Sequence, residues 1–350
     1  MRKLKHPSQK MRILLVGPMP PPFAGTTVLF RQLAELLAQT PQVECEVINV
    51  AGIRVRSIKG IIRLVAALVS LFRFSQRVDV VTVHVHLSSM HKIVPFCLLF
   101  AGIFRKPLVI RQFGGIGYYN LPPIRAKIDH WLYSCSTCCL FELKMIACKA
   151  KADGIGQAAW YSNSRFMSAE IRIPRDRCRK FVYVGHIKPS KGVFEILQAA
   201  DEIGSECSVD FYGPFDDGLS REVFEGHPNV QYCGVLDADE VIERLSAYDA
   251  LLLPSYHWGE GYPGVVLEAY SAGLPVICSR WQGLPEIVDD SCGILVEPRS
   301  AESLRIAMHE LIRNTERFRY VQEGVTKRRL EFSAELWRDR FIDLCKGLVE

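Results

Sequence analysis

The residues best suited to chemistry lie in one passage, residues 254–288, which reads PSYHWGEGYPGVVLEAYSAGLPVICSRWQGLPEIV. It follows an apolar run at residues 250–253 that is typical of a buried strand. Pro263 suits the first position of a helix, and Gly273 predicts where that helix ends. The passage therefore predicts a helix that begins at the carboxyl end of a strand, which is where parallel sheets bind their ligands.

The start of this helix is a predicted seat for a diphosphate. Backbone N–H groups in a first helical turn lack partners within the helix, and the helix dipole favours negative charge beside them. We expect Pro263 to begin the helix and its neighbours to supply the donors: Gly261, Tyr262, Gly264 and Val265.

Two carboxylates flank the predicted seat. Glu268 lies about one and a half turns into the helix, where it can accept hydrogen bonds from sugar or ribose hydroxyls. A diphosphate would repel Glu260, so we expect that carboxylate to face neutral hydroxyls or the positive charge that develops at an anomeric carbon. The two carboxylates therefore indicate sugar chemistry beside a bound phosphate.

A second passage, residues 181–197 (FVYVGHIKPSKGVFEIL), supplies positive charge. It reads as a strand, a turn at Gly185 and His186, a loop with Lys188 and Lys191, and then a helix. Gly185 lets the chain turn closely, and Lys191 enters at the start of the helix. A lysine in that position can neutralise charge on a leaving nucleoside diphosphate.

The elements that must position these residues alternate between strand and helix. Helical spacing, as at residues 27–39, separates the apolar runs, which predicts parallel sheets with right-handed crossovers. The periodicity breaks at residues 173–179 and then restarts, so we predict two doubly wound domains and a last helix at residues 334–349. The predicted strands are 12–16, 43–50, 78–85 and 108–111 in the first half, and 181–184, 208–212, 230–232, 250–253, 276–278 and 294–296 in the second.

The net charge of +5 hides an asymmetry. Residues 1–172 hold 23 Lys and Arg against 8 Asp and Glu, whereas residues 173–350 hold 20 against 30. The basic half is expected to bind a membrane surface, a lipid phosphate or a nucleic acid. The alternative is that the asymmetry is ordinary solvated surface charge with no binding role. No aromatic–basic platform or known reader motif accompanies the charge, which disfavours nucleic acid.

The stretch at residues 57–77, SIKGIIRLVAALVSLFRFSQR, permits two interpretations. Its apolar bulk and its four cations are typical of a basic amphipathic helix that lies on a membrane. The same pattern fits a crossover helix packed on a sheet, and both hold if one face packs and the other meets lipid. The longest uncharged apolar run, residues 93–104, is shorter than the ~20 residues that a membrane span needs.

The twelve cysteines favour no metal site. Cys135, Cys138 and Cys139 form the one tight cluster, and no second pair of ligands follows at zinc spacing. The chain begins MRKLKHPSQKMRILLV, which lacks the long apolar core of a signal peptide. We therefore expect reduced, structural thiols in a cytoplasmic protein.

These motifs resemble those of retaining glycosyltransferase family 4. Residues 185–192 resemble its "GR…KG" motif, and Glu260 with Glu268 matches its "E-x7-E" signature, followed by EA…GLPVI…GLPEIV. The resemblance extends over almost the whole chain: GPMPPPFAGT looks like the N-terminal glycine loop, VTVHVHLSS like the "HVH" strand end, and WYSNSR like the segment before the hinge. The E-x7-E passage is highly specific and the N-terminal matches are moderately so.

The resemblance implies an α/β GT-B fold, in which two Rossmann-like doubly wound parallel-sheet domains face a central cleft. The expected acceptor-side domain covers residues 1–175, and the expected nucleotide-sugar-binding domain covers residues 176–332. A C-terminal helix within residues 333–350 is expected to cross back to the first domain.

The resemblance also implies roles for single residues. Lys191 would contact the donor phosphates, Glu268 the ribose and Glu260 the transferred sugar. Gly25 and the adjacent Thr26, in the loop after the first strand, would let the backbone approach the donor phosphate or the acceptor.

Two residues depart from the family pattern. His186 stands where the family usually has arginine, so its phosphate contact would be weaker and pH-dependent. Phe113 takes the place of the usual histidine after the fourth strand of the first domain, and Arg111 or His86 would cover part of that role.

The sequence thus predicts a retaining, metal-independent glycosyltransferase of the hexosyltransferase type, which needs no cofactor and uses a UDP- or GDP-sugar as its donor. The expected acceptor is a lipid-linked or oligosaccharide chain of a lipopolysaccharide or exopolysaccharide, met at the inner face of the cell membrane by the basic domain. The alternative is a degenerate relative that holds a nucleotide sugar or a partner without turnover. A sugar-nucleotide epimerase of similar build would need a catalytic set that the sequence does not show.

Overall fold

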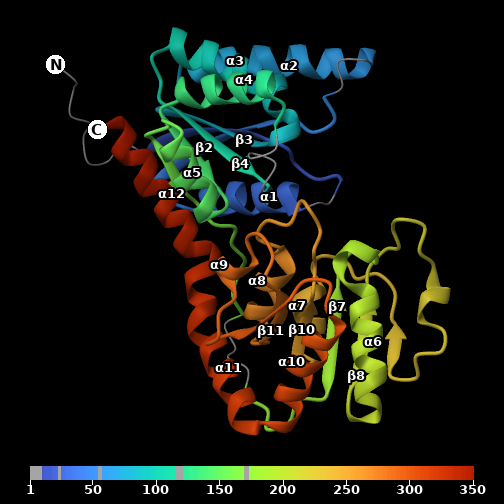
Figure 1. Ribbon diagram of the computed structural model, residues 1–350. Helices are drawn as coiled ribbons and strands as arrows, with labels where there is room; N and C mark the ends of the chain where they lie inside the picture. The colour runs from blue at the N-terminus through green and yellow to red at the C-terminus, as the bar shows by residue number, and fades with distance from the viewer. Residues whose placement is uncertain (1–9, 23–24, 54–56, 115–120, 169–172) are drawn as a thin grey trace. The chain divides into compact units, whose positions relative to one another are not determined.

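The computed structural model describes residues 10–22, 25–53, 57–114, 121–168 and 173–350. The chain divides into two compact units (Figure 1): unit 1 is Met1–Asn163 with Ala334–Glu350, and unit 2 is Ser164–Ser333. Each unit is built on a six-stranded sheet in which all neighbouring strands are parallel. This is the doubly wound α/β architecture that the alternation of strands and helices predicts.

The sheet of unit 1 has the strand order β2-β1-β3-β4-β5-β6. Helices α2, α3 and α4 lie over one face of this sheet, and α1 and α12 lie over the other (Figure 1). The elements of unit 1 are β1 (Met11–Gly17), α1 (Gly25–Ala38), β2 (Val43–Asn49), α2 (Ile58–Ser75), β3 (Val80–His86), η1 (Leu87–Ser89), α3 (Met90–Ile103), β4 (Leu108–Phe113), α4 (Pro123–Ser134), β5 (Cys138–Phe141), α5 (Lys144–Ala152), β6 (Ala158–Trp160) and α12 (Ala334–Val349).

The sheet of unit 2 has the order β12-β11-β10-β7-β8-β9. The chain leaves β7 toward β8 and leaves β10 toward β11, so the winding direction reverses between the adjacent strands β7 and β10. Ligands of open α/β sheets bind at such a reversal. The elements of unit 2 are β7 (Lys180–Val184), η3 (Pro189–Lys191), α6 (Val193–Ile203), η4 (Gly204–Glu206), β8 (Ser208–Tyr212), η5 (Arg221–Phe224), β9 (Val230–Tyr232), α7 (Val241–Leu245), β10 (Ala250–Leu253), α8 (Gly264–Ser271), β11 (Val276–Ser279), α9 (Leu284–Ile287), β12 (Gly293–Val296), α10 (Ala301–Arg313), α11 (Thr315–Arg328) and η6 (Arg329–Phe332).

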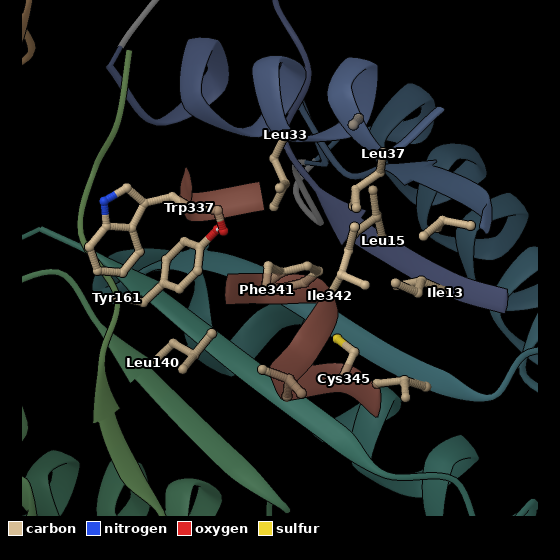
Figure 2. Close-up of a cluster of buried hydrophobic side chains, with 14 of the residues drawn as sticks. Ile13, Leu15, Leu33, Leu37, Leu140, Tyr161, Trp337, Phe341, Ile342 and Cys345 are labelled. Atoms are coloured by element: carbon tan, nitrogen blue, oxygen red, sulfur yellow. The ribbon is translucent and has the colours of Figure 1, made fainter. Parts of the chain in front are cut away.

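The last helix of the chain completes the core of unit 1. Figure 2 shows that side chains of α12 reach between α1 and the sheet, where they meet residues from the other end of the chain. The Tyr161 hydroxyl donates to the carbonyl oxygen of Trp337 at 2.7 Å, which fixes the start of α12 against β6. The helix contributes Trp337, Phe341, Ile342 and Cys345 to this cluster.

Most predicted strands are confirmed, and several have the predicted bounds: 208–212, 230–232 and 250–253. The helix predicted at residues 334–349 is also confirmed. The two short strands β5 and β6 were missed. Each is a run of four residues or fewer, too short to show a period of its own.

The division between the units falls at Asn163–Ser164, ahead of the predicted boundary at residues 175 and 176. The reason lies in the segment that follows Ser164. Arg165 pairs with Ser333 as a parallel bridge, and the backbone N–H of Ser168 donates to the Ser271 hydroxyl at 3.0 Å. These contacts join the segment to unit 2.

No helix in the described parts of the chain combines the length and hydropathy that a membrane span requires.

Candidate active site

The candidate site lies in unit 2, at the carboxyl ends of β7, β10 and β11. These three strands are adjacent and parallel, so the loops that follow them meet at one edge of the sheet. The loop after β7 carries Lys191, and the loop after β10 carries Glu260. The site therefore occupies the reversal of winding direction, which is where a doubly wound sheet is open to a ligand.

Lys191 and Glu260 form an ion pair in this structure. The lysine Nζ lies 2.9 Å from Oε1 and 2.7 Å from Oε2 of Glu260. Their side chains are 17% and 6% exposed, so the pair is largely removed from water. Sequence analysis assigned Lys191 to phosphate and Glu260 to sugar, and the structure brings the two residues into direct contact.

Gly192 permits this approach. Its φ of +81° lies in the left-handed region, and a Cβ atom there would stand 2.4 Å from the carbonyl oxygen of Pro254. The loop after β7 thus passes directly against the first residue that follows β10. The backbone N–H of Tyr256 also donates to the carbonyl of Ser190 at 2.9 Å, which ties the two loops together beside Lys191.

Ser255 orients the carboxylate, and sequence analysis missed it. This fully buried serine donates its hydroxyl hydrogen to Oε2 of Glu260. The same hydroxyl accepts from the backbone N–H of His257 at 3.2 Å. The Ser279 hydroxyl, at the end of β11, donates to the Ser255 carbonyl. A small polar residue two positions beyond the end of a ligand-edge strand was the signal that could have found it.

His257 is a second residue that sequence analysis missed. Its Nδ1 lies 3.2 Å from the Ser190 hydroxyl, and its carbonyl accepts from Trp281 Nε1 at 2.9 Å. Burial, and then the charges of Lys188 and Lys191, lower the pKa of this imidazole. The ring is therefore neutral around pH 7 and serves as a hydrogen-bonding group rather than a third cation.

Helix α8 begins one residue later than predicted. Pro263 precedes the helix with an extended ψ of 129°, and Gly264 is the first helical residue. Proline cannot donate an N–H group and its φ is fixed, so it serves equally well directly before a helix. Tyr262, predicted as a donor through its backbone, is buried and its hydroxyl donates to Glu286 in α9. This bond holds the loop that leads into α8.

Glu268, on α8, is paired with Arg165. The guanidinium Nε donates to Oε1 of Glu268 at 2.8 Å, and both side chains are largely buried. A Cβ atom on Gly264 would stand 2.1 Å from the arginine Nη2, so the guanidinium lies directly over the first residue of α8. Arg165 therefore adds a positive charge to the helix start, beside the position predicted for a diphosphate. Arg165 was not among the site residues predicted from the sequence.

His186 stands apart from the ion pair at Lys191. Its ring is 63% exposed, and Nδ1 lies 3.5 Å from Asp216 Oδ2. The preceding Gly185 has a φ of +156°, and its carbonyl oxygen would lie 1.9 Å from a Cβ atom on Gly213. The turn after β7 thus depends on close contact between two glycines, which directs His186 toward Asp216.

The four residues predicted on the first domain lie in unit 1, on β3, on β4 and at the start of α1. His86 ends β3, where its Nδ1 lies 2.9 Å from the Ser88 hydroxyl, and burial together with Arg125 lowers its pKa. Gly25 and Thr26 are the first residues of α1 rather than part of a loop.

Arg111 is a core residue rather than a residue of an open surface. Its side chain is buried, and its guanidinium carbon lies 4.7 Å and 4.4 Å from the ring centres of Phe113 and Tyr161. Burial lowers its pKa. Phe113, which stands where the family has a histidine, is buried beside it. These contacts favour a structural role for Arg111.

Unit 1 contains a cavity of about 520 Å³ that sequence analysis did not predict. It lies between α2 and the carboxyl end of β2, and Arg63 supplies a cation to its lining. The helix contributes small side chains to the lining, which leave the space open: Ala66, Ala67 and Ser70. Its volume is in the range of small-molecule sites.

Within the described residues, no group of three or more His, Cys, Asp or Glu side chains is arranged to hold a metal ion. The charged groups at the candidate site are instead cations that face carboxylates. The arrangement can offer two positive charges to a diphosphate, from Lys191 and Arg165, and two carboxylates to hydroxyl groups, from Glu260 and Glu268.

Comparison with known proteins relates this part of the chain to glycosyltransferases. Residues 178–314, which contain the whole candidate site except Arg165, match the family model described as glycosyl transferases group 1. The chain is 32% identical over 156 residues to the putative teichuronic acid biosynthesis glycosyltransferase TuaC of Bacillus subtilis, which covers 43% of this chain and 38% of TuaC. It is 30% identical over 199 residues to the sulfoquinovosyl transferase SQD2 of Arabidopsis thaliana, and this match covers 50% of this chain and 38% of SQD2.

The match therefore spans 38% of the length of each of these two relatives. Among solved structures, HepE of Anabaena in complex with UDP-glucose superposes with a TM-score of 0.72 at 14% identity, covering 96% of this chain and 100% of HepE. This likeness concerns the fold, which is the GT-B fold of glycosyltransferases. Residues 178–314 thus match the model of the glycosyl transferases group 1 family, within a chain that has the GT-B fold.

Proposed function

We propose that the protein is a retaining glycosyltransferase that moves a sugar from a nucleotide sugar to a lipid-linked or polysaccharide acceptor in cell-surface glycan biosynthesis. The observation that carries the proposal is the buried Lys191–Glu260 pair at the winding reversal of unit 2. A cation and a carboxylate side by side suit a reaction in which a phosphate leaves with negative charge and an anomeric carbon becomes positive.

Each partner of the pair has a task in this reaction. Lys191 neutralises the departing nucleoside diphosphate, which sits at the start of α8. Glu260 faces the hydroxyls of the sugar and stabilises the positive charge at its anomeric carbon. In this structure the two side chains neutralise each other, and donor binding replaces this contact with contacts to phosphate and sugar.

The Arg165–Glu268 pair completes the donor site. Arg165 lies over the first residue of α8 and adds positive charge for the diphosphate, while Glu268 accepts hydrogen bonds from the ribose. Two protein cations thus stabilise the leaving group, and the proposed reaction proceeds without a metal ion. The acceptor attacks from the face that the phosphate leaves, with the phosphate as its base, so the anomeric configuration is retained.

The relatives support the substrate classes. TuaC is described by its role in teichuronic acid biosynthesis, and HepE was solved with UDP-glucose. We accordingly propose a UDP- or GDP-hexose as donor and a cell-surface glycan as product. Such a reaction would take place on the cytoplasmic side of the membrane, where nucleotide sugars are made, and the cavity beside Arg63 is the proposed position of the acceptor.

Donor turnover tests the proposal. The purified full chain is incubated with UDP-, GDP-, ADP- and dTDP-sugars and with a detergent-dispersed lipid extract as acceptor source, and the released nucleotide is quantified. We expect release from one donor, and its loss in both Glu260→Gln and Lys191→Ala. Lys180→Ala, at an exposed position on β7, is the matched control and keeps full activity.

The alternative function, a module that holds a nucleotide sugar without turnover, gives a different result. The chain would then bind one nucleotide sugar in calorimetry and release no nucleotide from any donor, with acceptor present. That outcome would replace the transferase proposal.

A further inference from the structure

Three consecutive helices of unit 1 leave large apolar side chains exposed. Helices α2, α3 and α4 lie side by side over one face of the sheet (Figure 1). The ring of Phe72 on α2 is 5.9 Å from that of Phe100 on α3, and His91 on α3 lies 3.0 Å from Asp129 on α4. The exposed apolar residues of this outer surface are Ile58, Ile61, Ile62, Val65, Val69 and Phe72 on α2, Leu99 and Ile103 on α3, and Ile124, Ile128 and Trp131 on α4.

These side chains form one stripe on each helix. On α2 they recur every three or four residues, which places them on a single face. The buried residues of α2, such as Ala67 and Leu71, fall on the opposite face, toward the sheet. The same division holds on α4, where Trp131 is 59% exposed and Leu132 is buried. The exposed stripes are therefore not incomplete packing but a second apolar surface, which solvated monomers rarely carry.

The charge on these helices has one sign at the surface. They contain a single acidic residue, Asp129, which is buried between His91 and Arg125. The basic residues of the three helices are Lys59, Arg63, Arg73, Lys92, Arg125 and Lys127. Apolar side chains interleaved with cations match a lipid surface, which offers acyl chains and anionic headgroups at once.

A protein partner fits this surface less well. The apolar centre of a protein interface is depleted of lysine, and a partner would have to supply carboxylates across three helices. A bilayer needs no fixed arrangement of negative charges, because its headgroups can rearrange around each cation.

We propose that the outer surface of α2, α3 and α4 binds an anionic lipid bilayer, with the apolar stripes in the headgroup region and the cations among the lipid phosphates. The surface deepens the proposed function, since it would present unit 1 to acceptors carried on lipid. The partner is identified by its chemistry alone: a fluid surface that is apolar within and negatively charged at its boundary.

Vesicle flotation of the full chain tests the proposal. Vesicles of phosphatidylcholine alone are compared with vesicles that contain about 30% phosphatidylglycerol, enough to give a negative surface potential. We expect the chain to bind the anionic vesicles at least tenfold more tightly, with the difference falling as salt is added.

Three variants separate the contributions. The first replaces the α2 stripe by Ile62→Ser, Val65→Ser and Val69→Ser, and should lose at least tenfold in binding. The second carries Lys59→Glu, Arg73→Glu and Lys127→Glu, and should lose the preference for anionic lipid. The control removes equally exposed apolar groups from unit 2, by Val235→Ser, Ile306→Ser and Leu330→Ser, and should bind like the unchanged chain.

Two results would overturn the proposal. One is equal binding by the α2 variant and the unit 2 control. The other is an absence of vesicle binding together with a dimer, detected by light scattering, that the α2 variant abolishes, because the surface would then belong to a protein interface. Lys191→Ala should float like the unchanged chain, so a failure of the transferase proposal is distinguishable from a failure of this one.

Discussion

The ammonium nitrogen of Lys191 lies within 2.9 Å of both carboxylate oxygens of Glu260, although the two residues are 69 positions apart. A carboxylate that accepts from a lysine through both oxygens and from Ser255 as well is held in one orientation. The ammonium group of Lys191 is engaged in this contact. A bound diphosphate must compete with Glu260 for that lysine.

Breaking this pair should cost stability as well as activity. In Lys191→Ala the buried carboxylate of Glu260 loses its partner. We therefore expect the free energy of unfolding of unit 2 to fall by about 3 kcal/mol. Adding Glu260→Gln removes the unpaired charge, and the double variant should recover most of that loss while remaining inactive. Denaturant unfolding measures the first effect and nucleotide release the second. If the stability changes of Lys191→Ala and Glu260→Gln simply added in the double variant, the two side chains would not interact.

Ser255→Ala should affect turnover more than folding. The substitution removes the hydroxyl that orients Glu260 but leaves the Lys191–Glu260 contact in place. We expect kcat to fall about tenfold or more, because a loss of orientation acts on the transition state. Ser205→Ala, at an exposed position before β8, is the control. An unchanged kcat in Ser255→Ala, with the donor saturating, would show that the serine has no positioning role.

Gly264→Ala should displace Arg165. The new methyl group would stand 2.1 Å from the present position of Nη2, so the guanidinium must leave the start of α8. We expect a rise of about tenfold in the KM for the donor, similar to that of Arg165→Ala. The double variant should be no worse than either single variant, since both remove the same contact. Additive effects on KM would contradict this account.

Unit 1 should lose stability as the pH falls through 6.5. His84 is fully buried, and burial followed by the charge of Arg111 lowers its pKa well below the ordinary value. Below pH 6.5, His84 therefore binds a proton in the unfolded chain but stays neutral in the folded chain. The free energy of unfolding that is present above pH 6.5 is thus lost progressively below it. Between pH 7.5 and 5.5 the loss is about 1.4 kcal/mol.

His84→Gln should remove that part of the pH dependence, whatever it does to stability at pH 7.5. His309→Gln, on α10, should leave the slope unchanged. Urea unfolding at the two pH values measures both, and an equal slope in the two variants would contradict the assignment.

The sequence allowed the strands and the ligand-binding edge of unit 2 to be predicted, because buried parallel strands read as apolar runs that end at polar loops. The contacts at that edge could not be predicted. Lys191 meets Glu260 only because β10 is the neighbour of β7, and strand order leaves no trace in local periodicity. Arg165 was equally hidden, since its partner Glu268 lies 103 positions away.

Helix α12 has a consequence for the way the protein is made. The core of unit 1 contains Trp337, Phe341 and Cys345, so it cannot close until α12 has left the ribosome. Unit 2 needs no residue beyond Ser333 and can fold earlier. At roughly 5–20 residues per second, the first 163 residues wait on the order of ten to forty seconds for their final helix. During synthesis the N-terminal part is thus the later to mature, and it is the part that chaperones would protect.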